Sequence, residues 1–324
     1  MPNIAVVMAV YQPDPGFLQQ QLASIAEQTL PPQQIFAVIA DQTSAALVYD
    51  LAGGVGLRVE LVEPTTPLSA VDAFELGLQT ALGNPSITAI ALSDQDDIWH
   101  PEKLETCWEV MARTQADMVH SDARVVDAGG AVMHGSLFRR ERRQTAPGLR
   151  DLLYRNTVTG MTCLMRRSLL DRALPFPRQD GTHFYHDLWL ALIARAGRGL
   201  AFCPKTLVDY RQHGGNAVGV LGKSDGMVSL RARVAEYGLA RFLAESVTAR
   251  ATKADGLSPF CQSRSWGGAF LWDAARFLAT GRIQHAKKAA TWCGITIGRR
   301  IWALKETLRL SGYRAQQYLS LIHI

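Results

Sequence analysis

Short apolar runs alternate with stretches of helical periodicity along the first 115 residues. The continuous apolar runs, which are typical of strands covered on both faces of a parallel sheet, are 4–10, 35–40, 57–62 and 87–92. Apolar residues at helical spacing, or a proline suited to a first helical turn, predict helices over 17–28, 69–82 and from Pro101 to Met111. Four strand–loop–helix units predict a doubly wound parallel sheet, and such sheets bind ligands beyond the carboxyl ends of their strands.

The middle of the chain is less regular. Residues 118–133 predict two strands around a turn at Gly129-Gly130, and 186–197 predict a short helix. A strand or two then lead into a glycine loop at 214–215, and beyond about residue 225 the pattern is helical. A second, helical part therefore follows the α/β part.

Composition adds limits to this picture. The chain has 324 residues, of which 48% are hydrophobic and 19% charged, so disorder is excluded as the general state. No apolar run reaches the roughly 18 residues of a membrane-spanning helix, and the first residues lack the features of a secretory leader. Five cysteines without a C-x-x-C pair predict buried thiols in a reducing cytoplasm, not a zinc site or disulfide framework.

Charge is distributed unevenly. Residues 225–324 hold 15 Lys/Arg and 6 Asp/Glu, a net +9, whereas residues 1–224 carry a net −4. Basic regions favour anionic lipid, nucleic acid or acidic partners. Because no aromatic–basic signature of a nucleic-acid reader occurs, we expect no nucleic-acid partner.

The strongest local signal is the acidic cluster Asp94-Gln95-Asp96-Asp97, directly after an apolar strand. Three carboxylates in four residues repel one another, and a divalent cation holding a diphosphate would offset that repulsion. The alternative is a solvated acidic turn in which Asp97 helps to cap the helix expected from Pro101. The local sequence leaves both interpretations open.

Two further acids stand at the ends of predicted elements. Asp41 follows a strand and could accept hydrogen bonds from a nucleobase, or could simply form an Asx turn. Asp187 opens a helix, where an acid commonly makes only a charge–dipole contact. Neighbouring aromatic residues, including Tyr185 and Trp189, could desolvate Asp187 and raise its basicity, as a general base requires.

A cation and an imidazole lie beside the glycine loop. Arg211 is a candidate for binding phosphate oxygens, and His213 for binding a metal. A glycine turn decorated with polar residues is the alternative.

Six ordered motifs taken together resemble the family 2 glycosyltransferases, and among them the bacterial rhamnosyltransferase-like members. The motifs are AVVMAVYQ, AVIADQTS, LSDQDDIWHPEKL, NTVTGMTCLMRR, HDLWLALIA and YRQHGGN. They cover about residues 3–220, and although each is weak alone, a chance match of all six in this order is improbable.

The resemblance implies a GT-A fold, which is an α/β doubly wound, Rossmann-like mixed sheet, here with a C-terminal helical extension. It assigns nucleotide-binding roles to Ala9, Tyr11, Asp41 and Asp94. It assigns the D-x-D metal site to Asp94 and Asp96, with Asp96 the stronger candidate for the direct ligand of Mg²⁺ or Mn²⁺. The catalytic base would be Asp187, and the acceptor pocket would include Gly160, with His186 and Trp189 beside the base.

The match has departures from the family pattern. The first of the paired acids at the second strand end is Ala40, and Glu75 stands where an Asn is common. His186 replaces the usual Glu before the catalytic Asp. Glu75 leaves the construction of the diphosphate side of the pocket open.

The expected protein is therefore a metal-dependent inverting glycosyltransferase. Its GT-A domain spans 1–224, with a nucleotide-binding half at about 1–115 and an acceptor half at about 116–224, and a basic helical region follows at 225–324. It would move a sugar, first of all rhamnose, from a dTDP- or UDP-sugar to a glycan or lipid-linked acceptor in cell-surface polysaccharide synthesis. The alternatives are a nucleotidyltransferase and a non-catalytic sugar-nucleotide-binding protein. The expected location is cytoplasmic, with peripheral contact to the inner face of the membrane as one use of the basic region.

The basic region yields a test. Its tryptophans and cations suit docking on an anionic membrane surface, whereas a helical subdomain packed on the catalytic part is the alternative. If docking is correct, the full chain co-sediments with vesicles containing phosphatidylglycerol and is released by high salt. Absence of binding to such vesicles, with neutral phosphatidylcholine vesicles as the control, would eliminate docking.

Overall fold

The fold is known from a computed structural model, which describes residues 2–39, 41, 43–178 and 185–213. The predicted C-terminal helical region at 225–324 and the glycines at 214–215 lie outside the described residues. No helix among the described residues is both long and apolar enough to cross a membrane.

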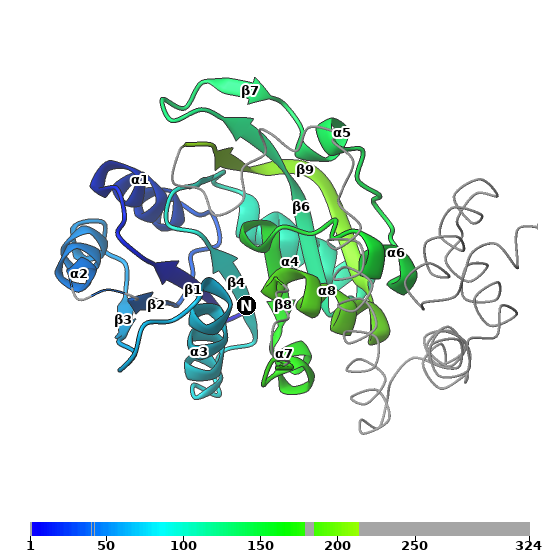
Figure 1. Cartoon of the computed structure of the whole chain (residues 1–324), viewed down its shortest axis with the longest axis horizontal. Helices are drawn as coiled ribbons and strands as arrows, with labels where there is room; N and C mark the ends of the chain where they lie inside the picture. Colours follow the sequence, from blue (N-terminus) through cyan, green and yellow to red (C-terminus); the bar gives the residue numbers. More distant parts are fainter. Residues whose placement is uncertain (1, 40, 42, 179–184, 214–324) are drawn as a thin grey trace, which may run out of the picture. The chain divides into compact units, whose positions relative to one another are not determined.

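One nine-stranded mixed sheet organises the described residues (Figure 1). Its parallel half is β3-β2-β1-β4, comprising β1 (Ile4–Val10), β2 (Gln34–Ile39), β3 (Val59–Val62) and β4 (Ala89–Ser93). The sheet continues as β8-β6-β9-β5, comprising β8 (Cys163–Arg166), β6 (Met118–Val126), β9 (Leu200–Arg211) and β5 (Ile98–Trp99), with β7 (Val132–His134) paired to β6. The strand β8 runs antiparallel to both β4 and β6, and so joins the parallel half to the rest.

Helices cover both faces of this sheet. On one face, α1 (Pro15–Ala26), α2 (Ser44–Gly54) and α4 (Lys103–Thr114) share one hydrophobic core with alternate residues of the parallel strands. On the other, α3 (Ala70–Leu82) packs on β1 and β2 and contacts α8 (His186–Ala196), which packs against α6 (Leu149–Tyr154) and α7 (Arg167–Ala173). The short α5 (Leu137–Glu141) and the single 3₁₀ turn η1 (Gly160–Thr162) complete the described helices.

The order of the strands creates a switch point. The chain passes from β1 to β2 by α1 on one face, and from β3 to β4 by α3 on the other. The loop that leaves β1 leads to α1, which packs beside α2, whereas the loop that leaves β4 leads through β5 to α4, which packs on β6, β8 and β9. The two loops therefore turn in opposite directions along the sheet, and ligands of doubly wound folds bind at such a point. Tyr11 follows β1 and Asp94 follows β4 at this point.

Most predicted elements are confirmed, with shifts at their ends. The helix expected over 69–82 begins at Ala70, and Ser69 caps it by accepting a hydrogen bond from the backbone N–H of Asp72 at 3.2 Å. The three cysteines in the described residues, Cys107, Cys163 and Cys203, are buried free thiols, as expected.

Two expectations about the helix after the acidic cluster are wrong. This helix, α4, begins at Lys103, and Pro101 lies in the turn before it, where the N–H of Lys103 donates to the carbonyl of His100 at 3.0 Å. Asp97 does not cap the helix, because the N-cap residue is Glu102 and the Asp97 carboxylate faces Arg211 instead.

The packing of α3 on the sheet leads to a stability prediction. A Cβ atom on Gly77 would stand 2.5 Å from Cγ1 of Val7 and 2.9 Å from Cγ2 of Val38, and β-branched strand residues have little freedom to move. We expect Gly77→Ala to lower the free energy of unfolding by about 1–2 kcal/mol, because overpacking outweighs the gain in helix propensity. Thermal unfolding measures this change.

Gly53 in α2 provides the matched control. A Cβ there would meet nothing within 4 Å, so Gly53→Ala should leave the protein unchanged or slightly more stable. Equal thermal midpoints for the two variants would contradict the proposed close contact of α3 with the sheet.

Candidate functional site

A buried arginine, Arg211, holds the acidic loop Asp94–Asp97 in place. The backbone N–H of Arg211, at the end of β9, donates to Oδ1 of Asp97 at 3.1 Å, and its Nε donates to the carbonyl of Asp96 at 2.9 Å. Its Nη1 donates to the carbonyl of Ala128 at 2.8 Å and its Nη2 to Oε1 of Gln20 at 2.6 Å. Arg211 thus holds the loop by one backbone hydrogen bond and one guanidinium hydrogen bond, while Nη1 and Nη2 fix the guanidinium itself to Ala128 and Gln20.

This arrangement corrects the expectation for Arg211. The side chain is only 1% exposed, and its guanidinium lies 4.4 Å from the centroid of the Phe17 ring. Its donors point to protein oxygens, so the structure does not support direct binding of substrate phosphate by Arg211. The cation supports the acidic loop.

Two of the predicted metal ligands meet at the surface of this loop. Nε2 of His213 lies 2.7 Å from Oδ2 of Asp96, and the imidazole also packs beside Phe17, with 5.2 Å between ring centroids. These residues are 117 positions apart in the sequence, so β9 and its exit bring them together. Both side chains are partly accessible.

The other two carboxyls of the loop are in an unfavourable environment for a negative charge. Burial, the charge of Asp96 and then that of Asp187 raise the pKa of Asp94 to about 7. Burial, then Asp96 and Asp94, raise the pKa of Asp97 well above its usual value, and its Oδ2 has no hydrogen-bond partner among the described residues. The loop therefore concentrates negative charge that a cation would relieve.

The residues fit a partial metal site. Among the described residues no group of three or more His, Cys, Asp or Glu side chains is arranged to hold a metal alone. A carboxylate oxygen of Asp96 and an imidazole nitrogen of His213 nevertheless provide donors suited to Mn²⁺ or Mg²⁺. Such ions commonly complete their coordination with substrate phosphates and water.

The loop after β1 is bound to the acidic loop by a side-chain amide. Oε1 of Gln95 accepts from the N–H of Tyr11 at 2.8 Å, and its Nε2 donates to the carbonyl of Tyr11 at 3.0 Å. The Tyr11 side chain is 59% exposed, and Ala9 lies just before it in β1. The loop that is predicted to bind the nucleobase therefore has a fixed backbone, and the ring of Tyr11 in it is accessible.

Asp41 lies beside this loop and forms the Asx turn that was the alternative to a nucleobase contact. Its Oδ2 accepts from the N–H of Gln12 at 2.8 Å, and its Oδ1 accepts from the N–H groups of Thr43 and Ser44, each at 3.0 Å. Burial acts in the opposite direction, but these hydrogen bonds and those from the Ser44 and Thr43 hydroxyls hold the pKa of Asp41 well below its usual value. Asp41 is therefore an ionised acceptor that ties the loop after β1 to the start of α2.

Asp187 occupies the second position of α8, as the sequence predicts, and is buried. Its Oδ1 accepts from the backbone N–H of Leu188 at 2.7 Å and from Nδ2 of Asn156 at 2.9 Å. Burial raises the pKa of Asp187 to about 6, against hydrogen bonds from Leu188, Asn156 and Gly160 and the charge of Arg143. A carboxyl with this pKa is a better proton acceptor than an exposed aspartate and is still largely ionised at neutral pH.

The fold brings Asp187 near the acidic loop. The charge of Asp187 contributes to the raised pKa of Asp94, so the two carboxyls are close enough to interact. The turn η1, which carries Gly160, packs directly on β4, the strand that leads to Asp94. The acidic loop and the start of α8 therefore lie near each other.

Gly160 and His186 lie together next to Asp187. A Cβ on Gly160 would stand 2.8 Å from Nε2 of His186, so the glycine allows this approach. The imidazole packs at a tilt against Phe74 of α3, with 4.1 Å between ring centroids, and burial lowers the pKa of His186 to about 3. Neither ring nitrogen has a hydrogen-bond partner among the described residues, and with this pKa His186 is a neutral group beside Asp187.

Trp189 departs from expectation. Its side chain is fully buried, and its Nε1 donates to the carbonyl of Ala173 in α7 at 2.9 Å. The structure does not support the expectation that Trp189 contacts the acceptor. The indole instead packs α8 against α7.

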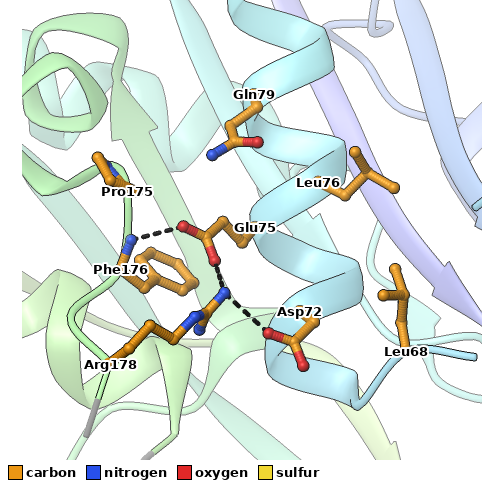
Figure 2. A pocket seen from close by; sticks show the side chains of 8 residues that line it. All are labelled: Leu68, Asp72, Glu75, Leu76, Gln79, Pro175, Phe176 and Arg178. Atoms are coloured by element: carbon orange, nitrogen blue, oxygen red, sulfur yellow. Dashed lines mark hydrogen bonds and ion pairs between the residues drawn. The ribbon is translucent and has the colours of Figure 1, made fainter. Parts of the chain in front are cut away.

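Glu75, the departure from the family pattern, has a defined structural partner (Figure 2). Its Oε1 accepts from the N–H of Phe176 at 2.6 Å, and its Oε2 forms an ion pair with Arg178, which also pairs with Asp72 at 2.8 Å. Figure 2 shows Asp72 and Glu75 on α3 facing Phe176 and Arg178 across a pocket, which Leu68, Leu76 and Gln79 also line. Glu75 therefore anchors the segment that follows α7.

Gln95, Asn156 and Arg143 have no role that the sequence predicts, yet all three contact or influence the site through hydrogen bonds or charge. Gln95 and Asn156 lie within the motifs that resemble the family, but the motifs do not indicate which residues these two side chains contact. Arg143 lies outside every motif, and only the fold reveals its contribution.

The sheet order and the site define an α/β fold of the GT-A type. The chain matches the family model described as "Glycosyltransferase like family 2" over residues 2–233, and it therefore belongs to this family.

Similar proteins agree with this assignment. The chain is 27% identical over 181 residues to the succinoglycan biosynthesis protein ExoW of Rhizobium meliloti (strain 1021), covering 51% of this chain and 55% of that protein. It thus spans about half the length of this curated relative. The fold resembles crystal structures of S. aureus TarS 1-349 in complex with UDP-GlcNAc (TM-score 0.56, 15% identity, 94% of this chain and 82% of that chain) and of S. aureus TarS (TM-score 0.55, 15% identity, 98% and 53%).

Proposed function

We propose that this glycosyltransferase is a metal-dependent inverting enzyme that moves a hexosyl group from a nucleoside-diphosphate sugar to a hydroxyl group. The observation that carries the proposal is the meeting of two predicted groups at one site. The two proposed metal ligands, Asp96 and His213, are within hydrogen-bond distance of each other, and the charge of Asp187 acts on Asp94 in the same loop.

The chemistry assigned to this chain's own residues is general-base catalysis. The Asp187 carboxylate takes the proton of an acceptor hydroxyl as that oxygen forms a bond to the anomeric carbon of the sugar. The bond from the anomeric carbon to the diphosphate oxygen breaks on the opposite face, and the nucleoside diphosphate leaves with the electron pair. A single displacement of this kind inverts the anomeric configuration and needs no covalent enzyme intermediate.

The metal would be held by Asp96 and His213, with Asp94 beside them. When bound, a divalent ion supplies positive charge that stabilises the departing diphosphate. The Tyr11 ring and the Asp41 carboxylate flank the side of the site assigned to the nucleobase. Gly160 and His186 flank the side assigned to the acceptor.

The donor and acceptor are finer parts of the proposal. A UDP-sugar is supported by the fold it shares with TarS, which was crystallised with UDP-GlcNAc, whereas rhamnose from dTDP-rhamnose rests on the motif resemblance. The similarity to a succinoglycan biosynthesis protein supports a glycan or lipid-linked glycan acceptor in cell-surface polysaccharide synthesis. We infer a cytoplasmic location from the nucleotide-sugar donor class.

Removing the base gives the first test. We expect Asp187→Asn to reduce glycosyl transfer by about 10²–10⁴-fold, because the amide cannot take the acceptor proton. In the unchanged protein the rate should fall as the pH drops through about 6, where the carboxyl becomes protonated. Nucleotide binding should survive in the variant, and an equal loss of binding and transfer would count against Asp187 as the base.

The metal and the donor are tested together by calorimetry. A panel of UDP-, dTDP- and GDP-sugars, each with and without Mn²⁺, identifies the nucleobase and the sugar of the donor that binds. Asp96→Ala should abolish the part of the affinity that depends on Mn²⁺, whereas Asp50→Ala, which removes an exposed carboxylate of α2, should not. An affinity for nucleotide sugar that is unchanged in Asp96→Ala with Mn²⁺ present would refute the metal assignment.

A further inference from the structure

Asn156 is a polar side chain bound directly to the proposed base. It follows α6 and is half-buried. Its Nδ2 donates to Oδ1 of Asp187 at 2.9 Å, and its Oδ1 accepts from the N–H of Val158 at 3.0 Å. Because the amide oxygen is used by a backbone N–H, the amide can present only its NH₂ group to the carboxylate, and its orientation is fixed.

The segment that carries Asn156 is itself held in place. Nη1 of Arg143 donates to the carbonyl of Thr157 at 3.2 Å and to Oγ1 of Thr159 at 2.7 Å. Nε of Arg143 pairs with Glu141 at 2.9 Å. The amide of Asn156 therefore projects from a braced turn, and its position does not depend on Asp187 alone.

The contact also determines how the carboxyl lies. Oδ1 of Asp187 receives two N–H groups, one from Leu188 in its own helix and one from Asn156 across the site. The bond within the helix constrains the oxygen from one direction. The Asn156 bond adds a second direction, so rotation about the Cβ–Cγ bond is restricted.

We propose that Asn156 is a positioning residue that orients the carboxylate of Asp187 for proton transfer from the acceptor. This inference rests on the proposed function. A neutral amide is suited to the task because it donates to the ionised carboxylate, whereas a carboxylate at this position would repel it. Among the ionisable groups near Asp187, Arg143 favours the charged carboxylate. Asp94 and Cys163 interact with it as groups that become negative, and the adjacent His186 is neutral.

The proposal is tested first without substrate. The Asp187 carboxyl is titrated in the metal-free full chain by ¹³C NMR with labelled aspartate, and Asp187→Asn identifies its signal. Loss of the donated hydrogen bond in Asn156→Ala should raise the Asp187 pKa by about one pH unit, and Asn156→Asp should raise it further through like-charge repulsion. An unchanged Asp187 pKa in both variants overturns the proposal.

Asn84→Ala is the matched control. Oδ1 of Asn84 closes a similar Asx turn by accepting from the N–H of Ser86 at 3.0 Å, but Asn84 has no contact with Asp187. This variant should leave the titration unchanged. If Asn156→Ala fails to fold by circular dichroism, Asn156→Ser and Asn156→Asp carry the test.

The second measurement is turnover, as release of nucleoside diphosphate from the nucleotide sugar that binds best in the calorimetric panel. Misorientation of the base should lower kcat of Asn156→Ala at least about tenfold, with donor affinity unchanged and the acidic limb of the pH profile moved to higher pH. Unchanged turnover and pH profile in Asn156→Ala overturn the positioning role. If Asp187→Asn is also fully active, it is the proposed function that fails.

Discussion

Repulsion among carboxyls at one edge of the sheet is the constraint on which the rest of the site depends. Asp94, Asp96 and Asp97 follow one strand, and the fold adds Asp187 from a distant helix. The buried guanidinium of Arg211 offsets part of this charge and fixes the backbone of the loop. At the accessible side of the loop Asp96 meets His213, and a cation bound there would offset the remaining repulsion.

The two halves of the sheet make different contributions to this edge. The parallel half ends in the loops that carry Tyr11, Asp41 and the acidic cluster, and cross-links such as the Gln95–Tyr11 pair join these loops. The rest of the sheet is joined to it by β8, which is antiparallel to β4. Through β8 and η1 the chain places Gly160, and behind it α8 with Asp187, beside the acidic loop.

Helix α3 connects packing with position. Gly77 lets it lie close on β1 and β2, so the helix has little freedom on the sheet. Its neighbouring residues Phe74 and Glu75 then make contacts beyond the sheet: Glu75 holds Phe176 and Arg178, and Phe74 packs against His186, the first residue of α8. A helix whose sequence shows only amphipathic periodicity thus supports the start of α8.

The sequence by itself determined the strands of the parallel half, the acidic cluster at a strand end and the placement of Asp187 in a first helical turn, because these follow from local apolar patterns and chain order. It could not determine which polar side chains face solvent. Arg211 and Trp189 look like ligand contacts in the sequence, but tertiary packing buries both and directs their donors to oxygens of the protein. The tertiary structure likewise decided that Asn156 binds Asp187 and that His213 contacts Asp96. Hydrogen bonds between residues far apart in the chain depend on how strands and helices are placed in space.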